Sequence, residues 1–153
     1  MIAPMPQPAT DTLTRIFSAA QSEARSRNQE FVGVEHLALA LLDDENSEAV
    51  RILRQMNVES GYVRNVLGHA LGNGAEPPII TGDLPMSPKA QKLVTKSVVS
   101  AQGSGRAKVS TRDLLCSILS EAGGVVCESF RRSGADTDEL ARALRDKDVT
   151  AES

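Results

Sequence analysis

Two adjacent ionisable side chains, Glu35 and His36, stand at the head of the apolar run FVGVEHLALALL, residues 31–42. An imidazole beside a carboxylate could take part in catalysis or bind a metal ion. A metal site needs further ligands, however, and the only other histidine of the sequence, His69, forms no His-Glu-x-x-His spacing with His36. The pair by itself therefore predicts neither a metal site nor a bound cofactor.

The residues that follow this pair indicate why it stands there. From Leu37 to Leu42 apolar residues cover every side of a helical turn, which is typical of a central helix buried by its neighbours. We therefore expect Glu35 and His36 at the N-terminal end of that helix, on the protein surface. The helix dipole favours a carboxylate in this place by roughly 0.3 to 1 kcal/mol, so Glu35 needs no further role to explain it.

Two further segments resemble reactive sites only superficially. The stretch QGSGRAKVS, residues 102–110, lacks the Gly-Lys-Ser/Thr end of a phosphate-binding loop and follows a predicted helix, so we expect a turn between helices. Cys116 and Cys127 have no histidine nearby in sequence and are expected to be buried thiols rather than nucleophiles. No nucleophile, base and oxyanion donor are assembled, and we do not expect an enzyme.

The composition argues against several classes of function. The 153 residues include three Phe, one Tyr and no Trp, so the core must come from Leu, Val, Ile and Ala, which favours helices. The net charge of −3 provides no basic surface for a nucleic-acid backbone. The sequence also begins without the features of a signal peptide, and no apolar run is long enough to span a membrane. We therefore expect a cytoplasmic protein that binds neither nucleic acid nor membrane.

The two halves of the chain are copies of one unit. Val32 corresponds to Val109, and the same offset of 77 residues aligns the halves without a gap. Aligned pairs include Ile16 with Leu93, Ala24 with Ala101, Leu37 with Leu114, Leu42 with Leu119 and Leu67 with Leu144. The Gly- and Pro-rich stretch between the copies cannot sustain a helix. The predicted organisation is one compact domain made of a disordered N-terminus (1–9), a first repeat (10–71), a linker (72–86), a second repeat (87–147) and a C-terminal tail (148–153).

Each copy is predicted to contain four helices. In the first copy their apolar spacing places them at about 11–27, 35–43, 47–56 and 59–71, and the second copy follows the same order. Ser87, which precedes Pro88, is predicted to cap the fifth helix and Thr111 to cap the sixth. The predicted fold is all-α, with eight helices in two four-helix units related by a pseudo-twofold axis. Its buried residues should include Leu37, Leu41, Leu114 and Ile118.

The two copies together resemble a known family. EFVGVEHLALALL in the first and GRAKVSTRDLLCSILSE in the second are similar to the double Clp repeat, the N-terminal domain of ClpA- and ClpC-type ATP-dependent unfoldases. The similarity covers about residues 10–147, and the segment before the sixth helix looks closer to the ClpA branch. The resemblance implies a non-catalytic, cofactor-free domain on a Clp ATPase ring that feeds the Clp peptidase. Such a domain docks ClpS-like adaptor proteins and unfolded or tagged substrate proteins.

The resemblance also implies a docking surface. In ClpA-like domains ClpS docks beside the start of the second helix, and the residues that match this surface are Glu30, Glu35, Ser87 and Lys92. In ClpC-type domains a glutamate of each copy takes part in recognising phosphoarginine. The second such position is Arg112 here, whose charge would repel the guanidinium of that ligand. A free-standing Clp-repeat regulator that binds the ring or the peptidase in trans remains an alternative function.

Overall fold

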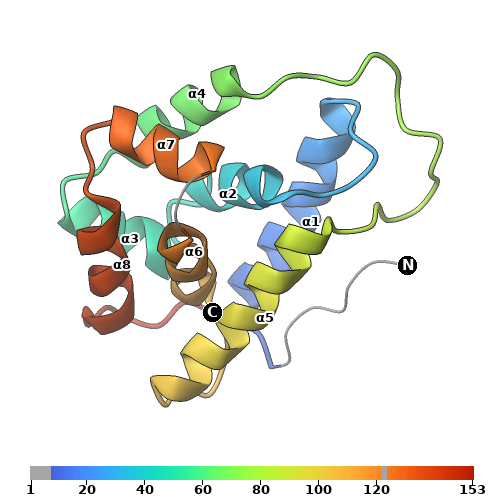
Figure 1. Cartoon of the computed structure of the whole chain (residues 1–153). Helices are drawn as coiled ribbons and strands as arrows, with labels where there is room; N and C mark the ends of the chain where they lie inside the picture. The colour runs from blue at the N-terminus through green and yellow to red at the C-terminus, as the bar shows by residue number, and fades with distance from the viewer. Residues whose placement is uncertain (1–7, 122–123) are drawn as a thin grey trace.

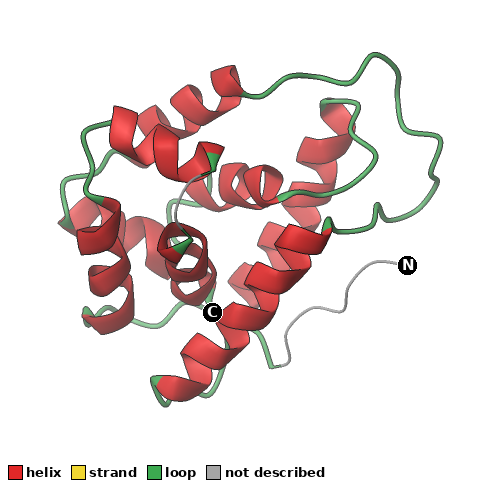
Figure 2. Cartoon of the chain, viewed as in Figure 1, coloured by secondary structure: helices red, strands yellow, loops and turns green. Residues whose placement is uncertain are grey.

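The structure is a computed structural model that describes residues 8–121 and 124–153 (Figure 1). Over these residues the chain forms eight helices and no strand, which confirms the all-α prediction (Figure 2). The helices are α1 (Asp11–Ser26), α2 (Val34–Leu42), α3 (Glu48–Gln55), α4 (Ser60–Ala70), α5 (Pro88–Gly103), α6 (Thr111–Ser120), α7 (Val125–Arg132) and α8 (Thr137–Asp146). The predicted bounds of the first four helices lie within one residue of these.

Hydroxyl side chains fix where the first helix of each repeat begins. Thr10 accepts a hydrogen bond of 3.0 Å from the backbone N–H of Leu13, and Ser87 accepts one of 3.1 Å from that of Ala90. Pro88 follows Ser87 at the start of α5, where a missing backbone N–H leaves no hydrogen bond unmade. The cap predicted at Ser87 is therefore confirmed, and Thr10 is its counterpart 77 residues earlier.

The two most completely buried helices, α2 and α6, lie at the centre of the molecule (Figure 1). α2 packs against α1 and α4, and α6 packs in the equivalent way against α5 and α8. The side chains predicted to be buried are at most 2% exposed, namely Leu37, Leu41, Leu114 and Ile118. Among the helices that the structure describes, none is both long and apolar enough to cross a bilayer.

The two repeats exchange contacts across their boundary. α4 of the first repeat packs against α7 of the second, and α3 of the first packs against α8 of the second. Because α3 corresponds to α7 and α4 to α8, these two contacts are equivalent. Such reciprocal contacts are what a twofold relation between similar units produces.

Two short backbone pairings continue this exchange at the helix entrances. Ala9, just before α1, pairs with Val109 before α6, and Met86, just before α5, pairs with Val32 before α2. The two pairings are equivalent, since 77 residues separate both Ala9 from Met86 and Val32 from Val109. Each is closed by two N–H···O=C hydrogen bonds, with N···O distances of 2.8 to 3.0 Å. Each repeat is therefore held at its beginning by the other.

Parts of the predicted disordered N-terminus and of the predicted linker belong to the packed fold. Of the predicted disordered N-terminus (1–9), residues 1–7 lie outside the described residues, whereas Pro8 and Ala9 are held by the pairing with Val109. In the predicted linker (72–86) most side chains are exposed, but Leu84 and Met86 are buried in the core. The end of the linker is therefore part of the packed fold.

Replacing Leu41 by alanine tests the central position of α2. The side chain is 0% exposed, so we expect Leu41→Ala to lower the free energy of unfolding by about 2 to 5 kcal/mol, through lost burial and the cavity left behind. Urea unfolding followed by circular dichroism measures this change. Val99→Ala on the exposed face of α5 is the control and should alter stability by less than about 0.5 kcal/mol. Equal effects of the two substitutions would contradict the packing described here.

Candidate functional site

Glu35 lies at the N-terminal end of α2, as the sequence predicts. The N-cap of this helix is Gly33, and the Glu35 carboxylate folds back over it. A methyl group on residue 33 would come within 2.7 Å of Glu35 Oε2, so a side chain at this position would require the Glu35 carboxylate to move aside. The Glu35 side chain is half-buried, and its backbone is held by a helix whose other residues are buried.

His36 is not on the surface, contrary to the prediction, because its ring serves as a helix cap. The residue is 5% exposed, and Nδ1 accepts a hydrogen bond of 2.9 Å from the backbone N–H of Gly33. An imidazole that accepts through Nδ1 must be neutral, with its proton on Nε2. Burial lowers the pKa of His36; Glu35, Arg27 and Glu23 have smaller effects, of which only that of Arg27 has the same direction. His36 is therefore a structural residue.

The start of α6 repeats this arrangement with a carboxylate in place of the imidazole. The N-cap is Ser110, one residue before the predicted Thr111, and its backbone N–H donates to Asp113 Oδ2 at 2.9 Å. Asp113 is fully buried and forms an ion pair with Arg106. His36 and Asp113 stand at equivalent positions. The reciprocal cap requires only a hydrogen-bond acceptor there, and an imidazole nitrogen supplies it in one repeat and a carboxylate oxygen in the other.

Arg112, the counterpart of Glu35, turns into the protein. It is 6% exposed, and it donates to the carbonyl oxygens of Leu144 at 2.7 Å and Lys147 at 2.5 Å, where α8 ends. Its Nε also lies 4.0 Å from Glu48 Oε1. The two repeats therefore differ at this position: the first presents a carboxylate near the surface, and the second uses its side chain to hold α8.

The four residues of the expected docking surface come from two segments of the chain. Glu30 is exposed in the turn between α1 and α2, and Glu35 stands in the first turn of α2. Ser87 caps α5, and Lys92 is exposed in the second turn of that helix. Within the described residues, no hydrogen bond or ion pair joins any two of these four side chains. They form an open group of separate polar side chains.

The backbone pairing at the start of α5 brings these two segments together. The N–H of Val32 donates to the carbonyl of Pro85 at 2.8 Å, and the N–H of Ser87 donates to the carbonyl of Val32 at 2.9 Å. Beside this pairing, Glu35 lines a narrow cleft together with Lys89 and the start of α7. Glu35 and Ser87 thus lie on neighbouring helix ends, which the sequence alone did not show.

Two more lysines belong to this region, and sequence reasoning missed them. Lys89, Lys92 and Lys96 recur along α5 at a spacing of three and four residues, which places them on one side of the helix. Lys96 donates to Glu121 Oε1 at 2.7 Å, and this bond, with weaker effects of Lys92 and Lys89, lowers the pKa of Glu121. The spacing is visible in the sequence, so this basic row was open to prediction.

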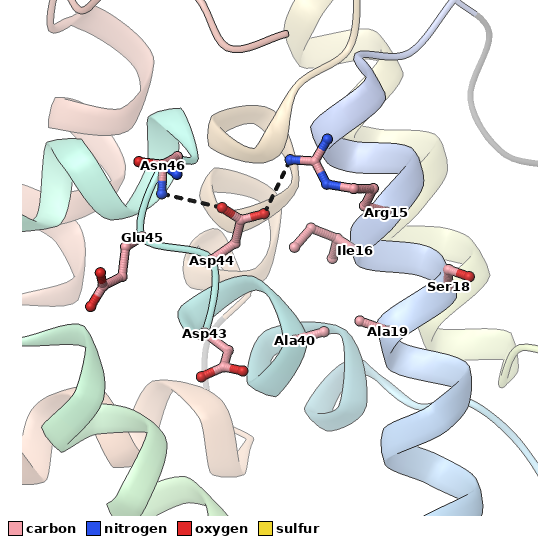
Figure 3. Close-up of a pocket in the computed structure, with 9 residues that line it drawn as sticks. All are labelled: Arg15, Ile16, Ser18, Ala19, Ala40, Asp43, Asp44, Glu45 and Asn46. Atoms are coloured by element: carbon pink, nitrogen blue, oxygen red, sulfur yellow. Dashed lines mark hydrogen bonds and ion pairs between the residues drawn. The ribbon is translucent and has the colours of Figure 1, made fainter.

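A wider hollow lies between α1 and the end of α2, with acidic residues on one wall (Figure 3). Asp44 is the organising residue: one carboxylate oxygen lies 3.6 Å from Arg15 Nη2, and the other accepts from the N–H of Asn46 at 3.2 Å. These contacts hold the turn that leads into α3. Among the described residues no group of three His, Cys, Asp or Glu side chains could bind a metal ion, here or elsewhere.

The family comparison identifies the architecture. The sequence matches the model of the Clp repeat (R) N-terminal domain over residues 9–132. The chain belongs to this family. The resemblance drawn from the repeated sequence is thereby confirmed.

Named relatives of this Clp repeat domain are much longer proteins. The ATP-dependent Clp protease ATP-binding subunit ClpA homolog, chloroplastic, of Brassica napus is 25% identical over 131 residues, which are 86% of this chain and 15% of that relative. Chaperone protein ClpC1, chloroplastic, of Arabidopsis thaliana is also 25% identical and is covered over 14% of its length. The Clp repeat domain thus spans about one seventh of these proteins.

Solved structures share the fold of this Clp repeat domain. The N-domain of ClpV from Vibrio cholerae superposes with a TM-score of 0.74 at 16% identity, covering 94% of this chain and 91% of that one. A complex of the ClpV N-domain with a VipB peptide gives a TM-score of 0.70 at 17% identity, covering 94% and 93%. At these identities the likeness supports the fold alone.

Both cysteines of the Clp repeat domain lie in the core, as predicted. Cys116 is 5% and Cys127 1% exposed, and both are free thiols. Burial raises the pKa of each thiol above its ordinary value. We expect both to react slowly with a thiol reagent in the native protein and rapidly in urea, because the reactive thiolate is scarce and shielded until the chain unfolds. Native labelling as fast as that of the unfolded chain would contradict this.

The buried cap of α2 should make stability depend on pH. Since the pKa of His36 is lowered in the folded state, the unfolded chain takes up a proton more readily. The free energy of unfolding should therefore be highest above about pH 6.5, the ordinary pKa of histidine, and fall as the pH drops below it. His36→Asn cannot be protonated and should lack this component, whereas His69→Asn, at an exposed position, should keep it.

Urea unfolding of the three proteins between pH 8 and pH 5 measures this difference. The contribution of carboxylates is common to all three and cancels in the comparison. The same pH dependence in the wild type and in His36→Asn would show that the imidazole is not the titrating cap.

Proposed function

We propose that this Clp repeat domain is a non-catalytic docking domain that binds a ClpS-like adaptor, and unfolded or tagged substrate proteins, for ATP-dependent proteolysis by a Clp peptidase. The family of the chain supports this proposal, as does the similarity to ATP-binding subunits of Clp proteases. The ClpV N-domain, which has the same fold, is known in complex with a VipB peptide. The proposal places the Clp ATPase ring and the peptidase as indirect partners, and it retains a cytoplasmic location.

The observation that carries the proposal is the placement of Glu35 beside the capped end of α5. The backbone pairing of Val32 with residues 85–87 holds these two helix ends together, and neither end can shift without breaking it. A partner that reaches across both ends meets a backbone that is already held in place, so no conformational entropy of that backbone is lost on binding.

The chemistry of the four side chains suits a polar protein partner. The carboxylates of Glu30 and Glu35 can accept charge-assisted hydrogen bonds from a lysine or a backbone amide of the adaptor. Ser87 Oγ accepts from Ala90 and keeps its hydroxyl proton for a partner. Lys92 adds an opposite charge that, together with Lys89, orients an acidic group of the partner.

Reversing the charge at Glu35 tests this surface. Glu35 makes no hydrogen bond within the described residues, so Glu35→Lys should leave the helical content unchanged. It should weaken adaptor binding at least tenfold, or roughly 1.4 kcal/mol, because a lysine would repel the groups that the carboxylate attracts. Titration calorimetry with a ClpS-type adaptor, alongside circular dichroism of the variant, gives both quantities.

A matched control lies at the other end of the same helix. Glu45→Lys makes the same charge change at an exposed residue just after α2 and should bind the adaptor as the wild type does. Unchanged affinity of a folded Glu35→Lys protein, or no binding by the wild type, would remove this surface from the proposal. Equal weakening by both variants would indicate a general charge effect instead of a docking site.

A further inference from the structure

The helices α4 and α8 occupy equivalent places in the two repeats, so their side chains can be compared position by position. α4 lies on the outside of the molecule beside α7 (Figure 1). Of its eleven residues, Val63 and Leu67 alone are buried, whereas α8 buries five of its ten. α4 therefore leaves most of its surface uncovered by the rest of the chain.

The uncovered face of α4 contains no acidic residue, lysine or arginine. Residues at a spacing of three and four share one face of a helix, and on α4 these are Tyr62, Asn65, Val66, His69 and Ala70. Tyr62, the single tyrosine of the chain, is 55% exposed. An aromatic side chain left in water loses the free energy that its burial would provide.

The corresponding face of α8 is charged. The offset of 77 residues aligns Tyr62, Asn65, His69 and Ala70 of α4 with Glu139, Arg142, Asp146 and Lys147 of α8. All four residues of α8 are exposed, as expected for a face that meets only water. The centre of a protein interface, by contrast, is poor in charge and rich in tyrosine. The comparison therefore favours a contact surface on α4.

A hollow of about 360 Å³ lies on the same face, between the C-terminal half of α4 and the end of α7. Val66 and Ala70 give it an apolar wall, and Arg132 lines its other side. Arg131 pairs with Glu128 at 3.7 Å, whereas no carboxylate among the described residues pairs with Arg132. An apolar wall facing a guanidinium suits an aromatic ring, because the ring packs on one and makes a cation–π contact with the other.

The face thus carries both a projecting ring and a hollow that suits one. Tyr62 stands one helical turn before Val66, at the N-terminal end of α4, whereas the hollow lies at the C-terminal end. Glu59, the exposed N-cap residue, gives the first end a carboxylate, opposite in sign to Arg132 at the second. Two such faces match each other when one is turned round, which is the property of a twofold contact between identical chains.

We propose that α4 is a self-association surface, through which two copies of this chain form an antiparallel contact with Tyr62 of each copy in the hollow of the other. With the twofold axis at Val66, Tyr62 of one copy lies opposite Ala70 of the other, and Glu59 approaches Arg132. Each contact then occurs twice. Two short helices bury less than the roughly 1,200 Å² typical of stable complexes, so the association is weak and reversible. This surface shares no residue with the adaptor surface around Glu35.

Sedimentation equilibrium of the full chain, at concentrations from about 10 μM to about 1 mM, tests the proposal. The average mass should rise toward that of a dimer with concentration. Tyr62→Glu, which gives α4 the residue of α8 at this position, should weaken dimerisation at least tenfold, or roughly 1.4 kcal/mol. Val99→Glu makes a similar change at an exposed apolar residue of α5 and should leave dimerisation unaltered. Circular dichroism confirms that each variant is folded.

A charge exchange tests the antiparallel arrangement. Arg132→Glu places two carboxylates together at each end of the contact and should also weaken dimerisation about tenfold, because the repulsion occurs twice. Adding Glu59→Arg to this variant restores opposite charges and should return the affinity to within about threefold of the wild-type value. A double variant that associates no better than Arg132→Glu would overturn the antiparallel contact.

Dilution of the wild-type chain locates the surface without any substitution. In nitrogen-15 spectra recorded over the same concentrations, the amide signals of residues 62–70 and of Arg132 should shift, and those of α8 should not. A monomeric mass up to about 1 mM, or equal weakening by Tyr62→Glu and Val99→Glu, would overturn the proposal. Adaptor binding is measured at the surface around Glu35, so either proposal can fail without the other.

Discussion

The exchanged backbone pairing at the helix entrances is the constraint on which the rest of the structure depends. Val32 and Val109 each give one N–H and one C=O to a segment of the other repeat, and so they fix where α2 and α6 begin. The segments they hold, which end at Thr10 and Ser87, also start α1 and α5. Four helices thus take their starting points from two small pairings. The surface around Glu35 lies directly beside one of them, and Thr10, whose hydroxyl donates to Glu152, belongs to the other.

The two repeats have equivalent backbones and different chemistry at these places. At the reciprocal cap, a buried imidazole in one repeat matches a buried carboxylate in the other, because the backbone N–H requires only an acceptor. Two positions earlier in the helix the repeats also differ: the buried hydroxyl of Thr111 accepts a hydrogen bond of 3.1 Å from the N–H of Ala49, whereas the equivalent residue Val34 is apolar. The duplicated frame therefore gives two similar pairs of helix ends whose side chains differ.

The general fold could be predicted from the sequence because apolar periodicity and the offset of 77 residues are strong, local signals. They located the helices and the buried faces of α2 and α6, and they placed both cysteines in the core. The position of His36 was predicted wrongly, since a polar residue at a helix start was assumed to face water. Whether it does so depends on how the neighbouring elements pack around the helix start, which is a tertiary effect.

The hydrogen bonds that the Glu152 carboxylate accepts from Thr10, Glu48 and Thr111 were beyond sequence reasoning for a related reason. Its donors lie more than forty, and in two cases more than a hundred, residues away, and no spacing rule connects such positions. The row of lysines on α5 is the opposite case, because its helical spacing can be read directly from the sequence. Long-range hydrogen bonds thus mark the limit of what the pattern of one sequence reveals.

The exchanged pairing also has a consequence for the order of events during protein synthesis. The entrance of α1 is anchored by Val109, about a hundred residues further along, so the first helix emerging from a ribosome lacks its anchor until most of the chain has been made. The apolar α2 likewise waits for Met86 and for α7. The first repeat therefore exposes apolar surface for several seconds at ordinary rates of protein synthesis. Contacts between such distant residues also slow the final search for the native state. A domain of this kind, whose proposed task is to receive unfolded chains, is therefore itself prone to aggregate while it is being made.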